Sequence, residues 1–165
     1  MRRSLTPVVD RHVLIQPAVV AMIAEASRSC RGQQETGGIL LGSIRGPHIE
    51  CVEFTRAGPN DLRGAYRFTL QDRLHQRKAR AAWSKSGSTV TFIGGWHTHP
   101  YGAPVPSSID ITSWMMLARD AGYPMLFLIA APDAWNGFRM TPRASSGYLN
   151  PLTIIENGTA GVVLK

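Results

Sequence analysis

Three stretches of the chain carry apolar residues at the spacing of an amphipathic helix. Residues 17–29 begin with a proline, which is favoured at the first helical position, and their apolar side chains fall on one helical face. Residues 69–84 show the same spacing, and Thr69 could cap them. Residues 108–121 are followed by Gly122, a residue typical of helix ends. We therefore predict three helices.

Shorter apolar runs of strand length lie between these helices. The run at residues 125–131 contains no charged residue, which is typical of a central strand buried on both faces. Two segments rich in turn-forming residues, 57–64 and 101–107, are expected to be loops. Alternation of helices and strands predicts an α/β or α+β sandwich around one sheet. The predicted strands are residues 39–44, 48–55, 89–93, 125–131 and 135–140.

Length and composition favour one globular domain that needs no covalent staple. The chain has 165 residues, of which 44% are hydrophobic, enough to build a core. Cys30 and Cys51 are far apart and form no C-x-x-C motif, so a cysteine-based zinc site or a disulfide scaffold has no support. No apolar run could cross a bilayer, and Met1-Arg2-Arg3 does not lead into a signal peptide. We expect a soluble, cytoplasmic protein with no membrane partner.

The net charge of +7 first suggests a nucleic-acid partner. The arginines are spread along the chain, however, and spread charge is weaker support than a patch. One local concentration lies within the second predicted helix, and it has two interpretations: a solvated helix face or a docking surface for an acidic partner. Its members are Arg73, Arg77, Lys78 and Arg80.

The most informative segment is His97-Thr98-His99-Pro100, followed by Ser107-Ser108-Ile109-Asp110. Residues i and i+2 of a strand point to the same face, so both imidazoles could reach one ion. Asp110, in the first turn of the third predicted helix, adds an oxygen ligand. Two histidines and one carboxylate, with a fourth position open to water, are typical of catalytic zinc.

A hydrolytic zinc site also needs groups that handle protons and charge. Zinc activates water at neutral pH, and a base must accept the proton that the water loses. Glu35 lies in an otherwise uncharged stretch just before the strand at residues 39–44, and it is the best candidate for this base. Ser107 is the candidate donor of a hydrogen bond to the oxyanion that forms when a carbonyl is attacked.

In order and spacing, these residues resemble the JAMM motif of the JAB/MPN/Mov34 zinc metallopeptidases: Glu35-Thr36-Gly37-Gly38, then His97-x-His99-Pro100, then Ser107-x-x-Asp110. The resemblance implies an α/β fold similar to that of cytidine deaminases, with a mixed central β-sheet flanked by helices. It implies a single domain over residues 1–165, with a core at about 12–142 and a C-terminal extension at 144–165. It also implies one zinc ion (Zn2+) per chain, held by His97, His99 and Asp110, with Glu35 as general acid and base and Ser107 as oxyanion donor.

Members of this family cleave isopeptide or peptide bonds after the C-terminus of ubiquitin or ubiquitin-like proteins. The short chain and the run from Pro106 to Trp114 look like bacterial JAB proteins encoded beside E1- and E2-like enzymes. Those operons serve anti-phage defence, either as CBASS systems or as conjugation systems like that of the interferon-stimulated ubiquitin-like modifier. The resemblance implies that the chain deconjugates targets or processes precursors. Its partners would be a ubiquitin-like protein or its conjugates, and the E1/E2-like enzymes.

Each part of the motif also has a simpler interpretation. Ser107-x-x-Asp110 before an apolar run is the pattern of a helix capping box, and Glu35 alone could be a solvated loop residue. A lone H-x-H pair is often polar sequence at a strand end. The combination at this spacing favours catalysis. We expect structural roles for the other histidines, and core positions or site walls for two tryptophans: His12, His48, His75, Trp96 and Trp114.

Two other functions remain open. One is a JAB peptidase that releases a sulfur-carrier protein or an amino-acid conjugate in biosynthesis, which neighbouring genes would distinguish. The other is a nucleic-acid-binding module; only the net charge suggests it, and we expect no nucleic-acid partner. It predicts affinity that falls steeply with salt. Base deamination has no support, because the His-x-Glu and Pro-Cys-x-x-Cys signature is missing.

Overall fold

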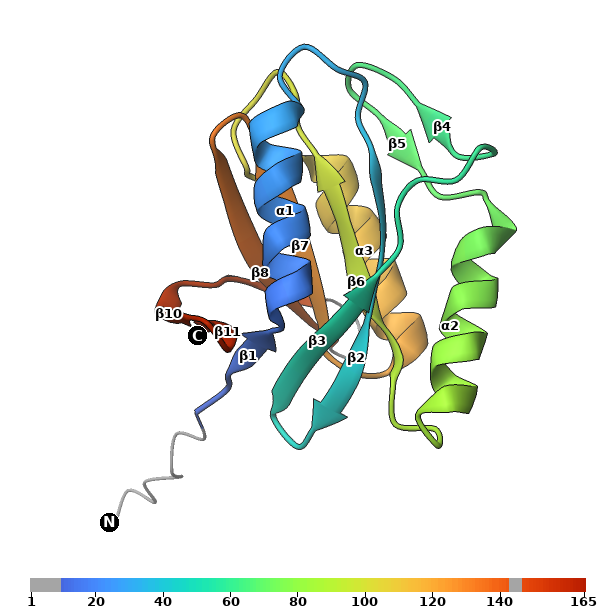
Figure 1. Cartoon of the computed structure of the whole chain (residues 1–165), viewed down its shortest axis with the longest axis vertical. Coiled ribbons are helices and arrows are strands. Elements are labelled where there is room, and N and C mark those ends of the chain that lie inside the picture. The colour runs from blue at the N-terminus through green and yellow to red at the C-terminus, as the bar shows by residue number, and fades with distance from the viewer. Residues whose placement is uncertain (1–9, 143–146) are drawn as a thin grey trace.

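A mixed β-sheet forms the centre of the molecule (Figure 1). The computed structural model describes residues 10–142 and 147–165 of the chain. The strands of the main sheet are β1 (Val13–Ile15), β2 (Gly37–Arg45), β3 (His48–Phe54), β6 (Thr91–Thr98), β7 (Met125–Ala131), β8 (Ala134–Pro142), β9 (Gly147–Pro151), β10 (Ile154–Gly158) and β11 (Gly161–Leu164). A small separate sheet contains β4 (Leu62–Arg63) and β5 (Phe68–Thr69). The helices of the described residues are α1 (Pro17–Ser29), α2 (Arg73–Lys85) and α3 (Ser108–Ala121).

The strand order in the main sheet is β10-β11-β1-β3-β2-β6-β7-β8-β9. Two neighbouring pairs are parallel, β1 with β3 and β6 with β7, whereas the other pairs are antiparallel. The prediction of an α/β fold with a mixed sheet flanked by helices is therefore confirmed. Across the described ranges, no helix has both the length and the apolar character needed to span a membrane.

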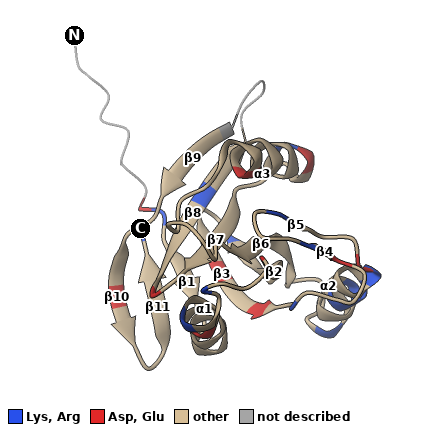
Figure 2. Ribbon diagram, turned by 90° about the horizontal axis from the view of Figure 1, so that it is seen from above, with Lys and Arg blue, Asp and Glu red and all other residues tan. Residues whose placement is uncertain are grey.

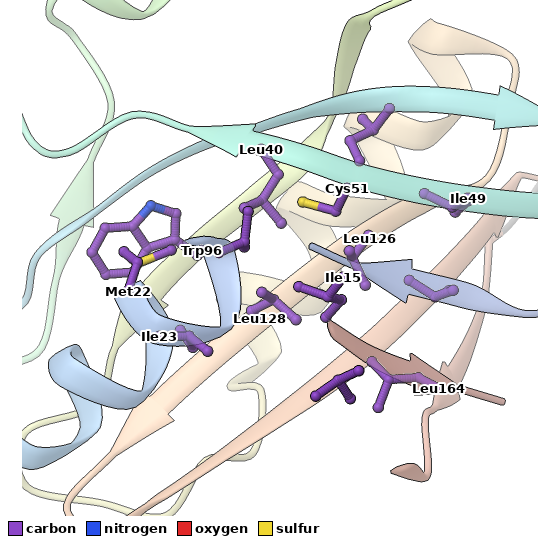
Figure 3. Packing of buried hydrophobic residues seen from close by; sticks show 14 of the residues in the cluster. Ile15, Met22, Ile23, Leu40, Ile49, Cys51, Trp96, Leu126, Leu128 and Leu164 are labelled. Atoms are coloured by element: carbon purple, nitrogen blue, oxygen red, sulfur yellow. The ribbon is translucent and has the colours of Figure 1, made fainter. Parts of the chain in front are cut away.

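The helices cover opposite faces of this sheet. α1 packs on one face against β3, β7 and β8, where Ile23 and Leu128 belong to the larger core (Figure 3). α2 and α3 lie on the other face (Figures 1 and 2). β7 contributes to both sides, because Leu126 belongs to the α1 side while Phe127 and Ile129 belong to the α3 side. All of β7 is buried, as the sequence predicted for a central strand.

Most predicted elements are present with small shifts at their ends. The helices predicted at residues 17–29 and 108–121 have those bounds, and Gly122 ends α3 in the left-handed conformation. The strand predicted at residues 125–131 is β7. The other four predicted strands correspond to β2, β3, β6 and β8.

The start of the second helix was predicted wrongly. α2 begins at Arg73, and Thr69 does not cap it, because Thr69 pairs with Leu62 in the small sheet. The cap is Asp72, whose carboxylate accepts a hydrogen bond from the backbone N–H of Leu74 at 2.8 Å. The predicted loop at 57–64 accordingly contains β4.

The C-terminal segment adds strands to both edges of the main sheet. β9 pairs with β8 at one edge, whereas the β10–β11 hairpin pairs with β1 near the other edge. Neither these strands nor β1 were predicted. Residues 144–146 of the expected extension, and Met1–Arg3, lie outside the described residues.

β6 contains a bulge just before its histidines. On β2, Leu40 pairs with Gly94 and Leu41 pairs with Phe92, which leaves Ile93 as the extra residue of β6. Leu40 and Ile93 both belong to the core on the α1 side, whereas Leu41 packs on the α2 side. The bulge therefore shifts the alternation of β6 by one residue.

This shift decides which side chains reach the face that carries α3. After the bulge, Trp96 enters the core on the α1 side, and its indole N–H donates to the carbonyl oxygen of Thr55 at 2.8 Å. His97 consequently faces Trp114 of α3. Gly94 makes the bulge possible, because its φ is +145° and an added Cβ would lie 1.7 Å from the carbonyl oxygen of Leu126.

We predict that Gly94→Ala destabilises the protein by about 3 kcal/mol or more, because the new Cβ combines backbone strain with a clash against β7. Urea unfolding of the variant and the wild type measures this difference. Gly158→Ala is the matched control, since Gly158 is exposed in β10 with open space around its Cβ position. Unfolding of Gly94→Ala at the wild-type urea concentration would contradict the bulge.

Candidate functional site

His97, near the end of β6, and His99, directly after the strand, approach each other. Their Nε2 atoms lie 2.9 Å apart. The Nδ1 atom of His99 lies 3.2 Å from the carbonyl oxygen of Ala103, which can only accept, so this nitrogen carries the proton. The Nε2 atom of His99 is then free to act as a ligand. The ring of His97 meets Trp114 edge-on, and Trp114 stacks on Phe127 at 4.4 Å between ring centroids.

Asp110 reaches the same point from the first turn of α3. One carboxylate oxygen, Oδ1, lies 3.3 Å from Nε2 of His97, and the other, Oδ2, lies 3.5 Å from Nε2 of His99. The backbone N–H and the hydroxyl of Ser107 both donate to Oδ2 at 2.7 Å, while the Ser107 hydroxyl accepts from the Asp110 N–H. The capping box considered from the sequence is therefore present. It aims Asp110 at the histidines, so capping and ligation are compatible.

These distances fit a zinc ion. Ligand atoms about 2.0–2.1 Å from a tetrahedral zinc ion lie roughly 3.3 Å from one another. The contacts of 2.9, 3.3 and 3.5 Å, the last two to different oxygens of Asp110, are close to that value, and one potential ligand atom from each residue lies within 4.8 Å of the others. All three residues are partly buried, and among the described residues they are the one group of three or more potential ligands close enough to share an ion. Nitrogen and carboxylate donors together also suit zinc.

The local charges keep Asp110 ionised. Burial opposes ionisation of Asp110, but hydrogen bonds from His97, His99 and Ser107 hold its pKa well below the usual range. Burial likewise lowers the pKa of His99, yet the hydrogen bonds to Asp110 and Ala103 outweigh it and raise that pKa overall. Asp110 is thus a carboxylate at neutral pH.

Glu35 lies before β2 and is 7% exposed. Its backbone is held on both sides, because its N–H donates to the carbonyl oxygen of Gly64 at 2.7 Å and its carbonyl oxygen accepts from Nε of Arg63 at 3.0 Å. Burial raises the pKa of the Glu35 carboxyl to about 7; His99 lowers it slightly and the Asp110 charge raises it. A carboxyl group with such a pKa can both accept and donate a proton near neutrality.

One pocket of about 750 Å3 contains all five residues singled out from the sequence: Glu35, His97, His99, Ser107 and Asp110. Its walls are largely apolar and aromatic, from Phe92, Trp96, Trp114, Ile109 and Phe127. The Ser107 hydroxyl donates to Asp110 here, so an oxyanion would have to compete for it. The sequence did not indicate Tyr66 and Tyr101, whose rings meet at 5.5 Å at this pocket. In the sequence, the one indication of these residues is that each is an aromatic residue in a loop: Tyr66 lies between β4 and β5, and Tyr101 lies between β6 and α3.

The remaining histidines do not join this site. His12 and His48 stack on each other, and His75 is buried between Thr55 and Asp61. Trp96 lies in the core and Trp114 in the pocket wall, which agrees with the two positions expected for them.

Residues 16–141 match the family model described as prokaryotic homologs of the JAB domain. A protein of Escherichia coli (strain TW11681) named CD-NTase/cGAS isopeptidase is 34% identical over 129 residues, which cover 78% of this chain and 82% of that protein. A Vibrio cholerae protein of the same name is 31% identical, with 78% and 82% covered. A probable metalloprotease of Sinorhizobium fredii is 28% identical, with 78% and 84% covered.

The fold also has a counterpart among solved structures. The solution structure of a protein from Desulfitobacterium hafniense superimposes with a TM-score of 0.56, covering 84% of this chain and 89% of that one. At 19% identity, this likeness concerns the fold alone.

We predict that Glu35→Gln stabilises the chelator-treated protein above neutral pH. Because folding raises the pKa of Glu35 to about 7, folding favours the protonated form, and the wild type loses stability as the pH rises toward that value. The variant should gain about 2 kcal/mol at pH 8 and little at pH 5. Urea unfolding at the two pH values measures this gain, with the exposed Glu53→Gln as control. An equal effect of Glu35→Gln at both pH values would argue against a buried carboxylate.

Proposed function

Since this chain belongs to the JAB-domain family, among its prokaryotic homologues, we propose that it is a zinc-dependent isopeptidase. The observation that carries the proposal is the cluster of His97, His99 and Asp110, whose potential ligand atoms lie within 4.8 Å of one another, beside a buried carboxyl whose pKa is about 7. His97, His99 and Asp110 would hold one zinc ion (Zn2+). That ion would supply a Lewis acid that polarises the substrate carbonyl and activates water.

The residues of the chain would manage protons and charge during the cleavage. Glu35, as the carboxylate, accepts a proton from the attacking water and passes it to the amine that leaves when the C–N bond breaks. The products are a free carboxylate and a free amine. Ser107 turns its hydroxyl from Asp110 toward the carbonyl oxygen, where it donates to the oxyanion. The backbone N–H of Ser107, 2.7 Å from Oδ2, keeps Asp110 in place meanwhile.

We propose that the substrates are conjugates made in a bacterial anti-phage system of the CBASS or ubiquitin-like type. The support is that three relatives at 31–38% identity are named CD-NTase/cGAS isopeptidase. These names favour conjugates over the sulfur carriers of a biosynthetic peptidase. The partners would be a ubiquitin-like protein or its conjugates and the E1/E2-like enzymes of the same operon, in the cytoplasm.

The positive charge would serve recognition of such a protein partner. α2 has no acidic residue, and its Arg73, Arg77, Lys78 and Arg80 are exposed on one side of the molecule (Figure 2). Among the described residues, no carboxylate forms an ion pair with them. An acidic surface on the conjugate fits this helix better than another basic one.

We expect the zinc-loaded protein to cleave a conjugate formed by the proteins of its own operon. Two variants should separate zinc binding from proton transfer. Glu35→Gln should keep one zinc ion per chain but lose at least about a hundredfold in kcat, because the proton acceptor is missing. His97→Ala should lose both zinc and activity. Gel-based cleavage and metal analysis measure these effects.

Two controls accompany this assay. Glu53→Gln and Asp120→Asn change exposed carboxyl groups, the latter on the same helix as Asp110, and both should behave as the wild type. Absence of cleavage by a zinc-loaded wild type across all operon proteins would refute the isopeptidase proposal.

We also expect the double variant Arg77→Glu/Arg80→Glu to raise KM about tenfold at low salt without changing kcat, because α2 would repel an acidic partner. Initial rates at several salt concentrations measure this effect. Arg28→Glu/Arg31→Glu, on and after α1, makes the same charge change on the opposite face and should leave KM unchanged. Equal KM values for the two double variants would exclude α2 from recognition.

A further inference from the structure

A second polar network lies outside the metal centre and is buried. Its members Thr55, Asp61 and His75 are 5%, 8% and 6% exposed. Nδ1 of His75 lies 2.6 Å from the Thr55 hydroxyl, and Nε2 lies 2.7 Å from Oδ2 of Asp61. Buried polar groups that are fully hydrogen-bonded specify one arrangement of the segments that carry them.

The hydrogen-bonding partners fix the protons of this network. The Thr55 hydroxyl oxygen already accepts from the backbone N–H of Ile39 at 2.9 Å, so its hydrogen is available to donate to His75. The Asp61 carboxylate only accepts, so Nε2 of His75 carries the ring proton. The network therefore runs in one direction, from the Ile39 N–H through Thr55 and His75 to Asp61.

Asp61 ties together the two ends of the segment between β3 and α2, residues 57–71. Its Oδ2 also accepts from the Gly58 N–H at 2.7 Å, near the start of this segment. Its Oδ1 accepts from the N–H groups of Gln71 and Asp72 at 2.7 and 2.8 Å, at the end of the segment. Burial raises the pKa of Asp61, but these hydrogen bonds outweigh it and lower the pKa to about 2. The Asp61 carboxylate thus holds the two ends of residues 57–71 together.

The middle of residues 57–71 contacts the candidate active site. Arg63 and Gly64 hold the backbone of Glu35 by the two hydrogen bonds described above. Tyr66, with Arg67 and Phe68, lines the pocket, whereas Arg63 does not. Residues 57–71 therefore connect the hydrogen bonds of Asp61, where the segment begins and ends, to the hydrogen bonds that hold the backbone of Glu35.

The other end of the network reaches the strands of the metal centre. The backbone N–H of Thr55 donates to the carbonyl oxygen of Ile39 at 3.0 Å, and the carbonyl oxygen of Thr55 accepts from the indole of Trp96. Trp96 directly precedes His97, and Gly38 approaches so closely that an added Cβ would lie 2.0 Å from the Thr55 carbonyl oxygen. Thr55 thus connects both β2 and β6 to the network by hydrogen bonds.

We propose that Asp61 and His75 are positioning residues for the isopeptidase reaction. They hold residues 57–71 closed at the base, so that Arg63 and Gly64 keep Glu35 at the pocket. The role in catalysis rests on the proposed function, whereas the coupling itself can be measured without a substrate.

Amide hydrogen exchange of the zinc-loaded protein tests the coupling. In Asp61→Asn, the side-chain amide would face the N–H groups of His75 and Gly58, so the segment should open and the Glu35 amide should exchange about tenfold faster. The exposed Arg63→Ala is a milder variant that leaves Asp61 intact; the Glu35 amide should exchange faster while the Gly58 amide stays protected. Zinc affinity should remain within about twofold of the wild type in both, because the proposed ligands lie at the end of β6, directly after it and on α3.

Cleavage kinetics test the catalytic consequence. Both variants should lose about tenfold in kcat, because Glu35 is no longer held in place. Ser27→Ala is the matched control: Ser27 is a buried residue of α1, and its hydroxyl is shared between the carbonyl oxygens of Ala131 and Ala134, away from residues 57–71. It should lower stability without changing kcat or the exchange of the Glu35 amide.

Two results would overturn the proposal. One is exchange at Glu35 in Asp61→Asn that matches Ser27→Ala, which would make the network merely stabilising. The other is faster exchange with an unchanged kcat. If the wild type cleaves no conjugate, the proposed function is wrong, while the exchange comparison still decides whether Asp61 holds Glu35.

Discussion

The pairing of β2 with β6 is the contact on which the site depends. Glu35 stands two residues before Gly37, and Gly37 pairs with His97. The strands approach closely here, since a Cβ on Gly37 would lie 2.3 Å from the carbonyl oxygen of Trp96. This register places the carboxyl group and the histidines at one end of the sheet, although they are far apart in the sequence. The strand β7 lies beside β6 and parallel to it, and α3 places Asp110 over this end of the sheet.

Electrostatics complements this geometry. Two carboxyl groups share one pocket with two imidazoles, and the surroundings give the two carboxyl groups different pKa values. Hydrogen bonds keep Asp110 ionised, whereas burial brings the pKa of Glu35 to about 7. A divalent cation held beside Asp110 would balance this negative charge, and Glu35 would stay free to exchange protons. In the proposed function, one carboxyl group would be a ligand and the other an acid–base group, and the difference between their pKa values comes from burial and hydrogen bonds.

Local patterns in the sequence predicted the parts of the fold that depend on local forces. α1, α3 and β7 have the expected bounds because periodicity, Pro17, Gly122 and an uninterrupted apolar run determine them. The start of α2 was missed because Asp72 outcompetes Thr69 as the cap. The strands β9–β11 were missed because their pairing with β8 and β1 involves distant segments. Motif spacing brought the five site residues together, whereas the Thr55–His75–Asp61 contacts depend on the path of residues 57–71, which no local pattern contains.

The bulge at Ile93 and Gly94 divides β6 into two halves with opposite phase. Ile93 and His97 are four residues apart, yet they face opposite sides of the sheet, because Ile93 is the extra residue of the bulge. The first half supplies Ile93 to the core on the α1 side, whereas the second half supplies Trp96 to that core and His97 to the candidate site. If β6 ran through this point as a regular strand without losing a residue, Trp96 would face the pocket and both histidines would turn into the core. Gly94, which permits the bulge, thus determines which side chains of the following residues face the candidate site.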